Sequence, residues 1–417
     1  MDFLTTLNNQ EHNAVECAVF DYLRTELEEN VLKYSKKDFE KYLTESITDF
    51  YYDAWCDSEL IDDDEDIYDE IYVYFNTIIL CFFEINVDYP PRSSCQYTII
   101  NNEDERDKIT KQIGHLKSVD QPKQKTDEWY TYRHNMLTAS TIWKIFGSEA
   151  SINSIIYEKC NPLNTNRVYS NSLVWGNMFE PVSIEFYENY YKTKIDDFGC
   201  ILHPNLHMIG ASPDGINVDP NSSKYGTMLE IKNIVNRDID GIPKEEYWIQ
   251  MQIQMETCNL DVCDFLETRF KTYESIEDFY HSSHEYKSVI LEFQNPEKQT
   301  EYVYIPFHCE NKGAFILETM KQKKDEKYHH VRNLYYYLDE YSCVTVSRNK
   351  KWFEEAKEYI ENCWKTIETE RETGYEHRKP KQKQNSMFSR KVFVTLQEDK
   401  HMIHNMPVSP NNIIKLG

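Results

Sequence analysis

The chain has 417 residues, of which 40% are hydrophobic and 28% are charged, with only 11 glycines and 14 prolines. These proportions are typical of a folded protein with a large core, and they exclude a collagenous or linker-dominated chain. At about 150 residues per domain, the length corresponds to two or three domains. No uninterrupted apolar run reaches about 18 residues, so the sequence predicts no membrane-spanning helix. The N-terminal residues lack the basic and apolar regions of a secretory signal, and we expect an intracellular protein of the cytoplasm or nucleus.

The 11 cysteines are scattered through the chain, and no two of them form a Cys-x-x-Cys pair. An odd number without paired spacing argues against a disulfide framework, a zinc finger or an iron–sulfur cluster. We therefore expect free thiols, buried or half-buried, in a reducing compartment.

The formal net charge of −25 is concentrated toward the N-terminal end. Residues 1–120 hold 28 acidic and 10 basic side chains, whereas residues 271–417 hold 23 of each. Residues 57–70 carry nine acidic side chains and no basic one, and residues 378–391 carry six basic side chains and no acidic one. Phosphate binding needs lysine and arginine, so contact with DNA is expected from local basic clusters. The candidate clusters are Lys144, Lys159 and Arg167; Lys321, Lys323, Lys324 and Lys327; and the basic tail.

The first 120 residues read as an acidic, mostly helical accessory domain. Apolar and aromatic side chains recur at helical spacing over residues 11–33 and 37–55. Residues 66–85 are a third candidate helix, although their isoleucine, tyrosine, valine and phenylalanine content also fits strands. An acidic helical module could mimic DNA or bind a partner, but the solvated face of an accessory domain is the favoured interpretation. Residues 101–125 are polar and predict a linker or a loosely packed helix.

From residue 126 onwards, predicted helices and strands alternate. Thr126 and Asp127 open one helix, and a second helix begins near Thr138 or Ser140. This order favours an α/β (α+β) fold, divided into an accessory domain at 1–120, a sheet domain at 121–373 and a basic, polar tail at 374–417. The further predicted elements are a helix that begins at or contains Glu180-Pro181, strands at 198–203, 207–212 and 227–234, a helix after Pro243, strands at 262–270, 288–293 and 301–307, and an amphipathic helix at 351–371.

Two short segments, Pro213-Asp214-Gly215 and Glu230-Ile231-Lys232, carry the clearest chemical signal. Successive side chains of a strand point to opposite faces, so Glu230 and Lys232 share one face. Asp214 lies where an apolar strand ends in a turn, and it meets them if the two strands are antiparallel neighbours. Hard oxygen ligands of this kind suit Mg²⁺ or Mn²⁺, and a lysine beside the metal can orient an attacking water. Taken alone the pattern is weak, because a surface ion pair and an ordinary turn would look the same.

Five motifs in a fixed order give the segment from Trp129 to Phe270 a resemblance to a known family. The motifs are Trp129-x3-Arg133-x4-Thr138-Ala139-Ser140, Gly176-x3-Glu180-Pro181, Ala211-Ser212-Pro213-Asp214-Gly215, Leu229-Glu230-Ile231-Lys232 and Tyr247-x2-Gln250-x-Gln252. The segment resembles the phage lambda exonuclease and YqaJ-type viral recombinase family of the PD-(D/E)xK nuclease superfamily. This resemblance implies a restriction-endonuclease-like core, in which a central mixed sheet is flanked by helices.

The resemblance implies a catalytic role for several acidic and basic side chains. Asp214 and Glu230 match metal ligands, together with the backbone carbonyl of Ile231. Lys232 matches the catalytic lysine, and Glu180 matches a helix carboxylate that completes the acidic site. The implied cofactor is Mg²⁺, with two ions per site and with Mn²⁺ able to substitute.

Further matching residues imply how water and substrate are held. Gln250 matches a glutamine that packs beside the lysine and the attacking water, on a helix that the family has at this position. Arg133, Ser140 and Ser212 match the groups that hold the 5′-phosphate of the degraded strand, and an arginine fork with hydroxyl donors suits a terminal phosphate. Without the resemblance, Arg133 reads as a surface ion-pair partner and Ser140 as a helix N-cap.

The combined interpretation is a Mg²⁺-dependent exonuclease that degrades one strand of linear double-stranded DNA from the 5′ end. The 3′ overhangs would serve recombination or repair of a viral genome. The expected partners are double-stranded DNA ends, a single-strand annealing protein and, because the family includes ring-shaped trimers, further copies of the chain; no membrane partner is expected. The alternatives are an endonuclease or repair nuclease of the same superfamily, and a non-catalytic scaffold that binds DNA or protein.

Overall fold

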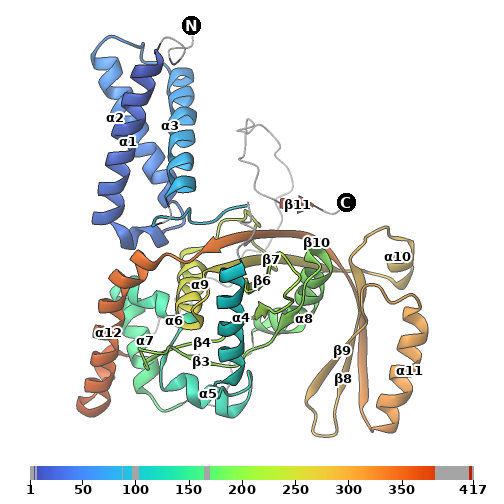
Figure 1. Ribbon diagram of the computed structural model, residues 1–417. Helices are drawn as coiled ribbons and strands as arrows, with labels where there is room; N and C mark the ends of the chain where they lie inside the picture. Colours follow the sequence, from blue (N-terminus) through green and yellow to red (C-terminus); the bar gives the residue numbers. More distant parts are fainter. Residues whose placement is uncertain are drawn as a thin grey trace, which may run out of the picture.

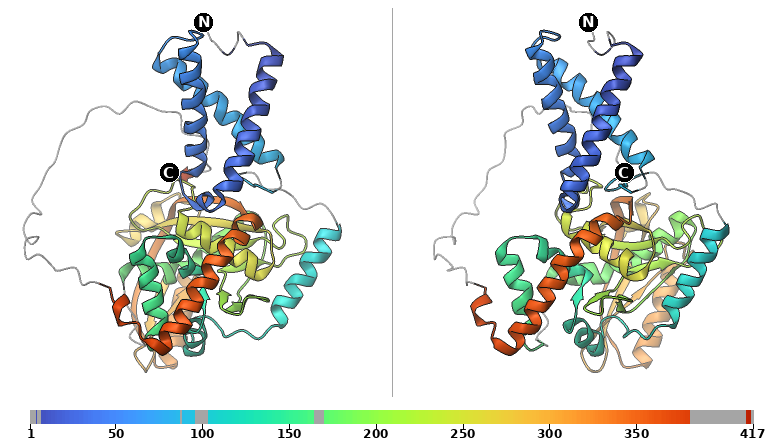
Figure 2. Two further views of the ribbon diagram at one scale, coloured as in Figure 1. Left: turned by 90° about the vertical axis from the view of Figure 1, so that its left-hand side faces the viewer. Right: turned by 60° about the vertical axis from the view of Figure 1, so that its left-hand side comes forward.

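The computed structural model describes residues 4, 7–86, 88–95, 103–163, 170–380 and the backbone of 413–415. Three long helices near the N-terminus, α1 to α3, stand together on a larger domain that contains the sheets (Figures 1 and 2). Arg167 and most of the predicted tail, residues 381–412, lie outside the described part of the chain.

The N-terminal helical unit consists of α1 (Asn9–Glu29), the 3₁₀-helix η2 (Val31–Ser35), α2 (Phe39–Asp57) and α3 (Glu65–Ile85). The Asn8 side chain caps α1 by accepting hydrogen bonds from the backbone N–H groups of Gln10 and Glu11, and the Glu11 carboxylate accepts one from the Asn8 N–H. The inward-facing apolar side chains, such as Leu27 and Phe75, are buried. The third segment is a helix rather than strands because its apolar residues follow the helical period and close this small core.

A buried arginine joins the helical unit to the sheet domain. The Arg92 guanidinium donates hydrogen bonds to the backbone carbonyls of Tyr34 (3.1 Å), Ser35 (2.9 Å) and Pro243 (2.7 Å). The Trp248 indole N–H in turn donates to the Arg92 carbonyl at 3.0 Å. Because these carbonyls come from both parts of the molecule, Arg92 ties the unit to the domain below it.

Helix α4 (Glu103–Ser118) packs on the sheet domain, although the division predicted from sequence places it with the N-terminal segment. Ile113 and Leu116 are buried, so the helix contributes to the core instead of forming a linker. The Gln112 amide donates to the Cys258 carbonyl at 2.7 Å. A short apolar stripe in a polar sequence is therefore enough to dock this helix.

The main sheet has eight strands, seven of them in the order β2-β5-β6-β7-β10-β8-β9, with β11 paired to β10. β6 and β7 are parallel, whereas the other pairs are antiparallel. The strands are β2 (Ile195–Asp196), β5 (Gly215–Asn217), β6 (Met228–Asn233), β7 (Val262–Thr272), β8 (Lys287–Gln294), β9 (Thr300–Tyr304), β10 (His329–Ser347) and β11 (Ile413–Lys415).

The long strand β10 and helix α11 (Lys312–Asp325) are not among the elements predicted from sequence. The last part of β10 pairs with β7 and its first part pairs with β8, so one strand links both halves of the sheet (Figure 1). The first part of β10 is largely exposed or half-buried, and α11 has no fully buried side chain. Neither segment therefore has the apolar pattern that sequence-based prediction needs.

Two helices cover opposite faces of β6. Leu229 and Ile231 pack with Phe179 of α8 (Asn171–Tyr191). Glu230 faces the other way and accepts a hydrogen bond from α9 (Glu245–Cys258). The alternation predicted for this strand is therefore confirmed. Pro181 lies inside α8, so the alternative that Glu180-Pro181 starts a helix is wrong.

A second sheet of three strands, in the order β1-β4-β3, lies beside α9. Its strands and neighbouring helices are α5 (Asp127–His134), β1 (Leu137–Thr138), α6 (Ala139–Ile142), η3 (Trp143–Phe146), α7 (Glu149–Cys160), β3 (Ile201–Leu202) and β4 (Ile209–Ala211). Helix α12 (Lys350–Thr373) packs along α7 with Trp352 and Ile360 buried, as its amphipathic pattern predicts (Figure 2). Helix α10 (Ile276–His281) and η4 (Glu376–Arg378) complete the described helices, and none of the helices in these ranges is long and apolar enough to cross a membrane.

Candidate active site

The turn between β4 and β5 carries Asp214 to the neighbouring strand β6. β5 and β6 are antiparallel, with Gly215 opposite Leu229. One carboxylate oxygen of Asp214 accepts a hydrogen bond from the backbone N–H of Ile231 at 2.7 Å. The strand that ends at the turn is β4, which lies in the second sheet, so the condition set by the sequence, that this strand be the antiparallel neighbour of β6, is not met. The strand after the turn, β5, is that neighbour instead, and it still places Asp214 beside the Glu230-Ile231-Lys232 segment.

Glu230 is almost completely buried, with 1% of its surface exposed, and both of its oxygens have partners. Oε1 accepts hydrogen bonds from the Lys232 ammonium and from the Gln250 amide, the latter at 2.8 Å. Oε2 accepts from the Gln254 amide at 2.8 Å. Gln250 and Gln254 are one helical turn apart on α9. The prediction of a helix for this segment is therefore confirmed, and the strand that the alternating pattern of residues also allowed does not form.

The surroundings of the site raise the pKa values of both Asp214 and Lys232. Burial, and next the nearby Glu230 charge and then Glu180, raise the pKa of the Asp214 carboxyl well above its ordinary value. Burial disfavours the charge on Lys232, but Glu230 and Asp214 outweigh it, so the pKa of Lys232 is raised. Lys232 therefore stays an ammonium, and its Nζ lies 4.7 Å from the ring centre of Tyr247.

Glu180 approaches the site from α8. Its two carboxylate oxygens each lie 3.2 Å from the ammonium of Lys125. The residue before Lys125 in the chain is Gln124. The Gln124 amide donates to the Pro213 carbonyl at 3.1 Å, next to Asp214. The segment before α5 thus contacts the turn that carries Asp214 and supplies a cation to the third carboxylate, an arrangement that the sequence did not predict.

Arg133, Ser140 and Ser212 meet in one place, as the resemblance implies. The Arg133 guanidinium donates to Ser212 Oγ at 3.2 Å and to Ser140 Oγ at 2.9 Å. Trp129 also donates to Ser212 Oγ at 3.2 Å, and its ring lies 4.2 Å from the Arg133 guanidinium carbon. Thr138 is the N-cap of the short helix, so the alternative role of Ser140 as an N-cap is wrong.

Arg133 has no carboxylate within ion-pair distance among the residues that the structure describes. A cation held by hydroxyl groups and an indole, without a fixed anion, can bind an incoming phosphate. Burial is the main cause that lowers the pKa of Arg133 and that of Lys159, the latter to about 8. Lys159 is 4% exposed and donates to the Arg133 carbonyl, so its expected place in a DNA-contacting surface cluster is wrong.

The donor chemistry of the acidic residues fits a hard divalent cation. Asp214 and Glu230 are neighbouring carboxylates, the Ile231 carbonyl belongs to the same strand, and repulsion from Glu230 and Glu180 helps to raise the pKa of Asp214. Within the described ranges, however, no three His, Cys, Asp or Glu side chains are already gathered as a metal-binding group. Lys232 and Lys125 instead neutralise Glu230 and Glu180. A cation between the carboxylates would relieve the same repulsion.

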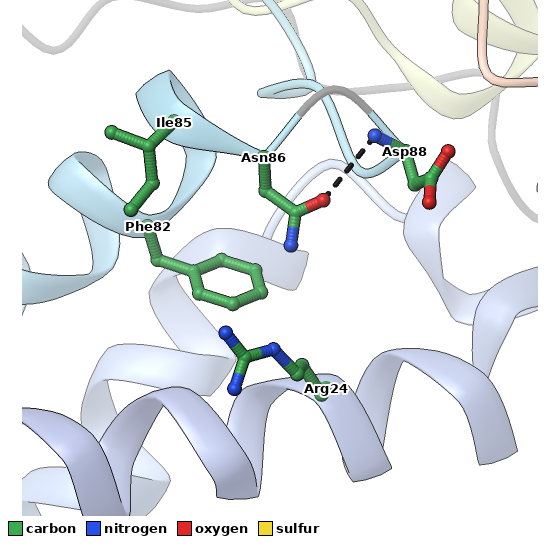
Figure 3. A pocket seen from close by; sticks show the side chains of 5 residues that line it. All are labelled: Arg24, Phe82, Ile85, Asn86 and Asp88. Atoms are coloured by element: carbon green, nitrogen blue, oxygen red, sulfur yellow. Dashed lines mark hydrogen bonds between the residues drawn. The ribbon is translucent and has the colours of Figure 1, made fainter.

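Two hollows elsewhere on the molecule do not belong to this site. One, of about 200 Å³, lies in the helical unit between Arg24, Phe82 and Asn86 (Figure 3). The other, of about 560 Å³, is lined by aromatic rings that include Trp175 and Tyr337. Neither hollow is lined by Asp214, Glu230 or Lys232.

Asp214 precedes one strand of the mixed sheet and Glu230-Ile231-Lys232 lies on its antiparallel neighbour, which is the arrangement that the resemblance to PD-(D/E)xK nucleases implies. Residues 128–261 match the family model described as the YqaJ-like viral recombinase domain. The match falls on the segment in which the five motifs predict a similarity to that family.

Comparison with individual proteins gives more distant similarities. An uncharacterized protein of Acanthamoeba polyphaga mimivirus is 27% identical over 295 residues, which are 60% of this chain and 53% of that protein. The chain thus spans about half the length of this relative. An alkaline exonuclease from Laribacter hongkongensis aligns with 60% of this chain and 95% of its own, at 20% identity and a TM-score of 0.38. The same enzyme in complex with dAMP aligns at 19% identity and a TM-score of 0.36.

Proposed function

We propose that the protein is a Mg²⁺-dependent DNA exonuclease that degrades one strand of linear double-stranded DNA from its 5′ end. One observation carries the proposal: Ser212 and Asp214 belong to the same turn. Ser212 bonds to the Arg133 guanidinium, and Asp214 bonds to β6 beside Glu230. A group suited to a terminal phosphate and a group suited to a metal are therefore two residues apart. This arrangement fits an enzyme that cuts next to a 5′ end.

In this proposal the acidic side chains and the ammonium have separate roles. Asp214, Glu230, Glu180 and the Ile231 carbonyl would hold Mg²⁺, one or two ions, which supplies positive charge where the phosphodiester becomes more negative. Lys232 keeps its proton, because its raised pKa lies far above neutrality, and donates hydrogen bonds that orient the attacking water.

Gln250 and the phosphate-binding residues complete the assignment. The Gln250 amide, which already donates to Glu230, would turn its carbonyl oxygen toward the water that Lys232 holds. Arg133, Ser140 and Ser212 would receive the 5′-phosphate, so that the strand end is placed in register with the carboxylates.

The test offers the purified protein three substrates in Mg²⁺: linear duplex with 5′-phosphates, the same duplex with 5′-hydroxyls, and closed circular duplex. We expect shortening from 5′-phosphorylated ends, intact circles and no cleavage by the Asp214→Asn variant. Equal cleavage of circles and linear duplex would instead support an endonuclease. No cleavage, together with no Mg²⁺ binding in calorimetry, would support a non-catalytic scaffold.

The family description, a viral recombinase domain, supports a use of the 3′ overhangs in recombination or repair of a viral genome. A single-strand annealing protein is the partner that such overhangs require. Co-purification of the full chain with candidate annealing proteins, in the presence and absence of linear DNA, tests this part of the proposal.

A further inference from the structure

Three glutamines of α9, at positions 250, 252 and 254, have different environments. Gln250 and Gln254 face β6, because residues four apart share one side of a helix. Gln252 points the other way: its amide donates to the Ser347 carbonyl at 3.0 Å, and its carbonyl accepts from the Asn349 N–H at 2.7 Å. Gln252 and Gln254 are almost equally buried, at 1% and 0% exposure. They therefore form a matched pair within one helix.

Gln254 contacts both halves of the candidate active site. Its amide nitrogen donates to Glu230 Oε2 at 2.8 Å and lies 3.5 Å from the backbone carbonyl of Ser212. The hydroxyl of the same serine accepts a hydrogen bond from Arg133. One side-chain amide thus touches the carboxylate on β6 and the turn that contributes to the phosphate-binding group.

The remaining polar atom of Gln254 adds a second observation. Its carbonyl oxygen is buried and has no hydrogen-bond partner among the described residues. Leaving a buried acceptor unpaired costs about 1–3 kcal/mol. The amide is nevertheless kept at this position, where it is the donor to Oε2 of the buried Glu230 carboxylate.

We propose that Gln254 is a positioning residue that fixes the Glu230 carboxylate relative to the Ser212 turn, and so couples recognition of the 5′-phosphate to cleavage. This inference rests on the proposed exonuclease function. Gln250 and Lys232 hold only Oε1 of Glu230, whereas Gln254 holds Oε2. Without Gln254 the Glu230 carboxylate can rotate. The distance from the bound 5′ end of the DNA strand to the carboxylates of the site is then no longer fixed.

The test compares Gln254→Met with Gln252→Met, two changes that remove a buried amide of similar shape from the same helix. For Gln254→Met we expect kcat to fall by about 10- to 100-fold, the range expected for small misplacements of catalytic groups. We also expect a smaller ratio of rates on 5′-phosphorylated and 5′-hydroxyl ends. For Gln252→Met we expect a lower melting temperature with an unchanged ratio of rates, since this residue joins β10 to α12.

A second variant, Gln254→Glu, keeps the size of the side chain and places a carboxylate against Glu230. Its deficit relative to the wild type should shrink as the pH falls, because a protonated glutamate can donate to Glu230 again. Equal effects of Gln252→Met and Gln254→Met on the ratio of rates, or an unchanged ratio in both, would overturn the inference. A wild-type protein that degrades no DNA would instead overturn the proposed function, so the two failures are distinguishable.

Discussion

The helical unit and the sheet domain place their charged side chains in opposite ways. In α1 to α3 the acidic residues lie mostly on the solvent side, around a core of apolar side chains such as Leu23 and Phe75. In the sheet domain, three carboxylates of β6 and β7 lie inside, with Glu230 at 1% exposure and Asp264 and Glu267 at 0%. The large negative charge of the first region is thus carried by its surface, and the smaller charge of the second is partly buried.

The comparison shows that only the buried carboxylates of the sheet domain carry a desolvation cost that needs an explanation. A charge in water costs little, whereas a buried charge is kept only when it is paired or used. Asp264 is held from several sides, by Lys224 at 2.7 Å, by the Tyr187 hydroxyl at 2.6 Å and by the Thr345 hydroxyl at 2.8 Å, which is a structural network. Glu230 is also held, by Lys232, Gln250 and Gln254, but it has a second carboxylate, Asp214, beside it. Neighbouring carboxylates with a raised pKa are typical of functional sites, whereas the Asp264 network is typical of a structural one.

The largest effect should separate these two buried networks. Lys232→Met removes the ammonium from the candidate active site, and we expect DNA cleavage to fall by about 1,000-fold, or about 4 kcal/mol in barrier height. Lys224→Met, which removes the partner of Asp264, should lower thermal stability and leave the chemistry of the remaining folded protein intact. Single-turnover cleavage and thermal melting measure the two effects. If both variants lost cleavage only in proportion to their loss of folded protein, Lys232 would have no role beyond stability, and this would contradict the prediction.

The second effect concerns the buried cation at the junction of the two regions. Arg92→Met removes hydrogen bonds to the carbonyls of Tyr34, Ser35 and Pro243, so we expect the free energy of unfolding to fall by about 3 kcal/mol. Denaturant titration measures this change, and limited proteolysis should then release the helical unit. Arg24→Met is the control: Arg24 is exposed and pairs only with exposed groups, and we expect a change within about 0.5 kcal/mol.

The third effect tests the proposed phosphate-binding role of Arg133, Ser140 and Ser212. Arg133→Lys keeps the charge but loses the planar fork that bonds Ser140 and Ser212 at once. We expect the preference for 5′-phosphorylated over 5′-hydroxyl ends to fall by about 10-fold, or about 1.4 kcal/mol. Lys144→Met, which removes a surface ion pair with Glu158, should leave this preference unchanged. The rates on the two kinds of end, measured under identical conditions, decide between the outcomes.

The fourth prediction concerns how the stability of the metal-free protein depends on pH. Burial and then Glu230 raise the pKa of Asp214 above its unfolded value of about 4. When a carboxyl has a higher pKa in the folded state than in the unfolded state, the folded state holds the proton more tightly. The free energy of unfolding of the protein therefore falls as the pH rises from the unfolded pKa toward the folded pKa. Asp214→Asn should therefore flatten this decline and raise the melting temperature near neutral pH. An unchanged pH profile in the variant would show that Asp214 is not the group responsible.

The smallest effect concerns the surface cation of the site. Lys125→Met frees Glu180 from an ion pair that is half exposed and worth about 0.2–1 kcal/mol. If Glu180 helps to hold Mg²⁺, the Mg²⁺ concentration for half-maximal cleavage should fall by up to about 5-fold. Lys41→Met, which breaks an exposed ion pair with Glu45 within α2 of the helical unit, should not change it.

Much of the molecule could be predicted where the signal is local. The helices α1, α2, α9 and α12 follow apolar spacing, start signals or both, and these are properties of short stretches of chain. The shared face of Glu230 and Lys232 follows from the alternation of a strand. The grouping of Arg133, Ser140 and Ser212 came from the family motifs rather than from physics, because Ser212 lies 79 residues after Arg133 and no local pattern links them.

The sequence by itself determined which side chains share a strand, a helix face or a turn, since these relations depend only on backbone geometry. Only the tertiary structure decided that Gln254 holds Glu230, that Lys125 pairs with Glu180, and that the polar helix α4 docks on the sheet domain. The same holds for β10, whose two halves pair with different strands. Such contacts join segments that are distant along the chain, and no local period records which partner a side chain or strand edge will meet.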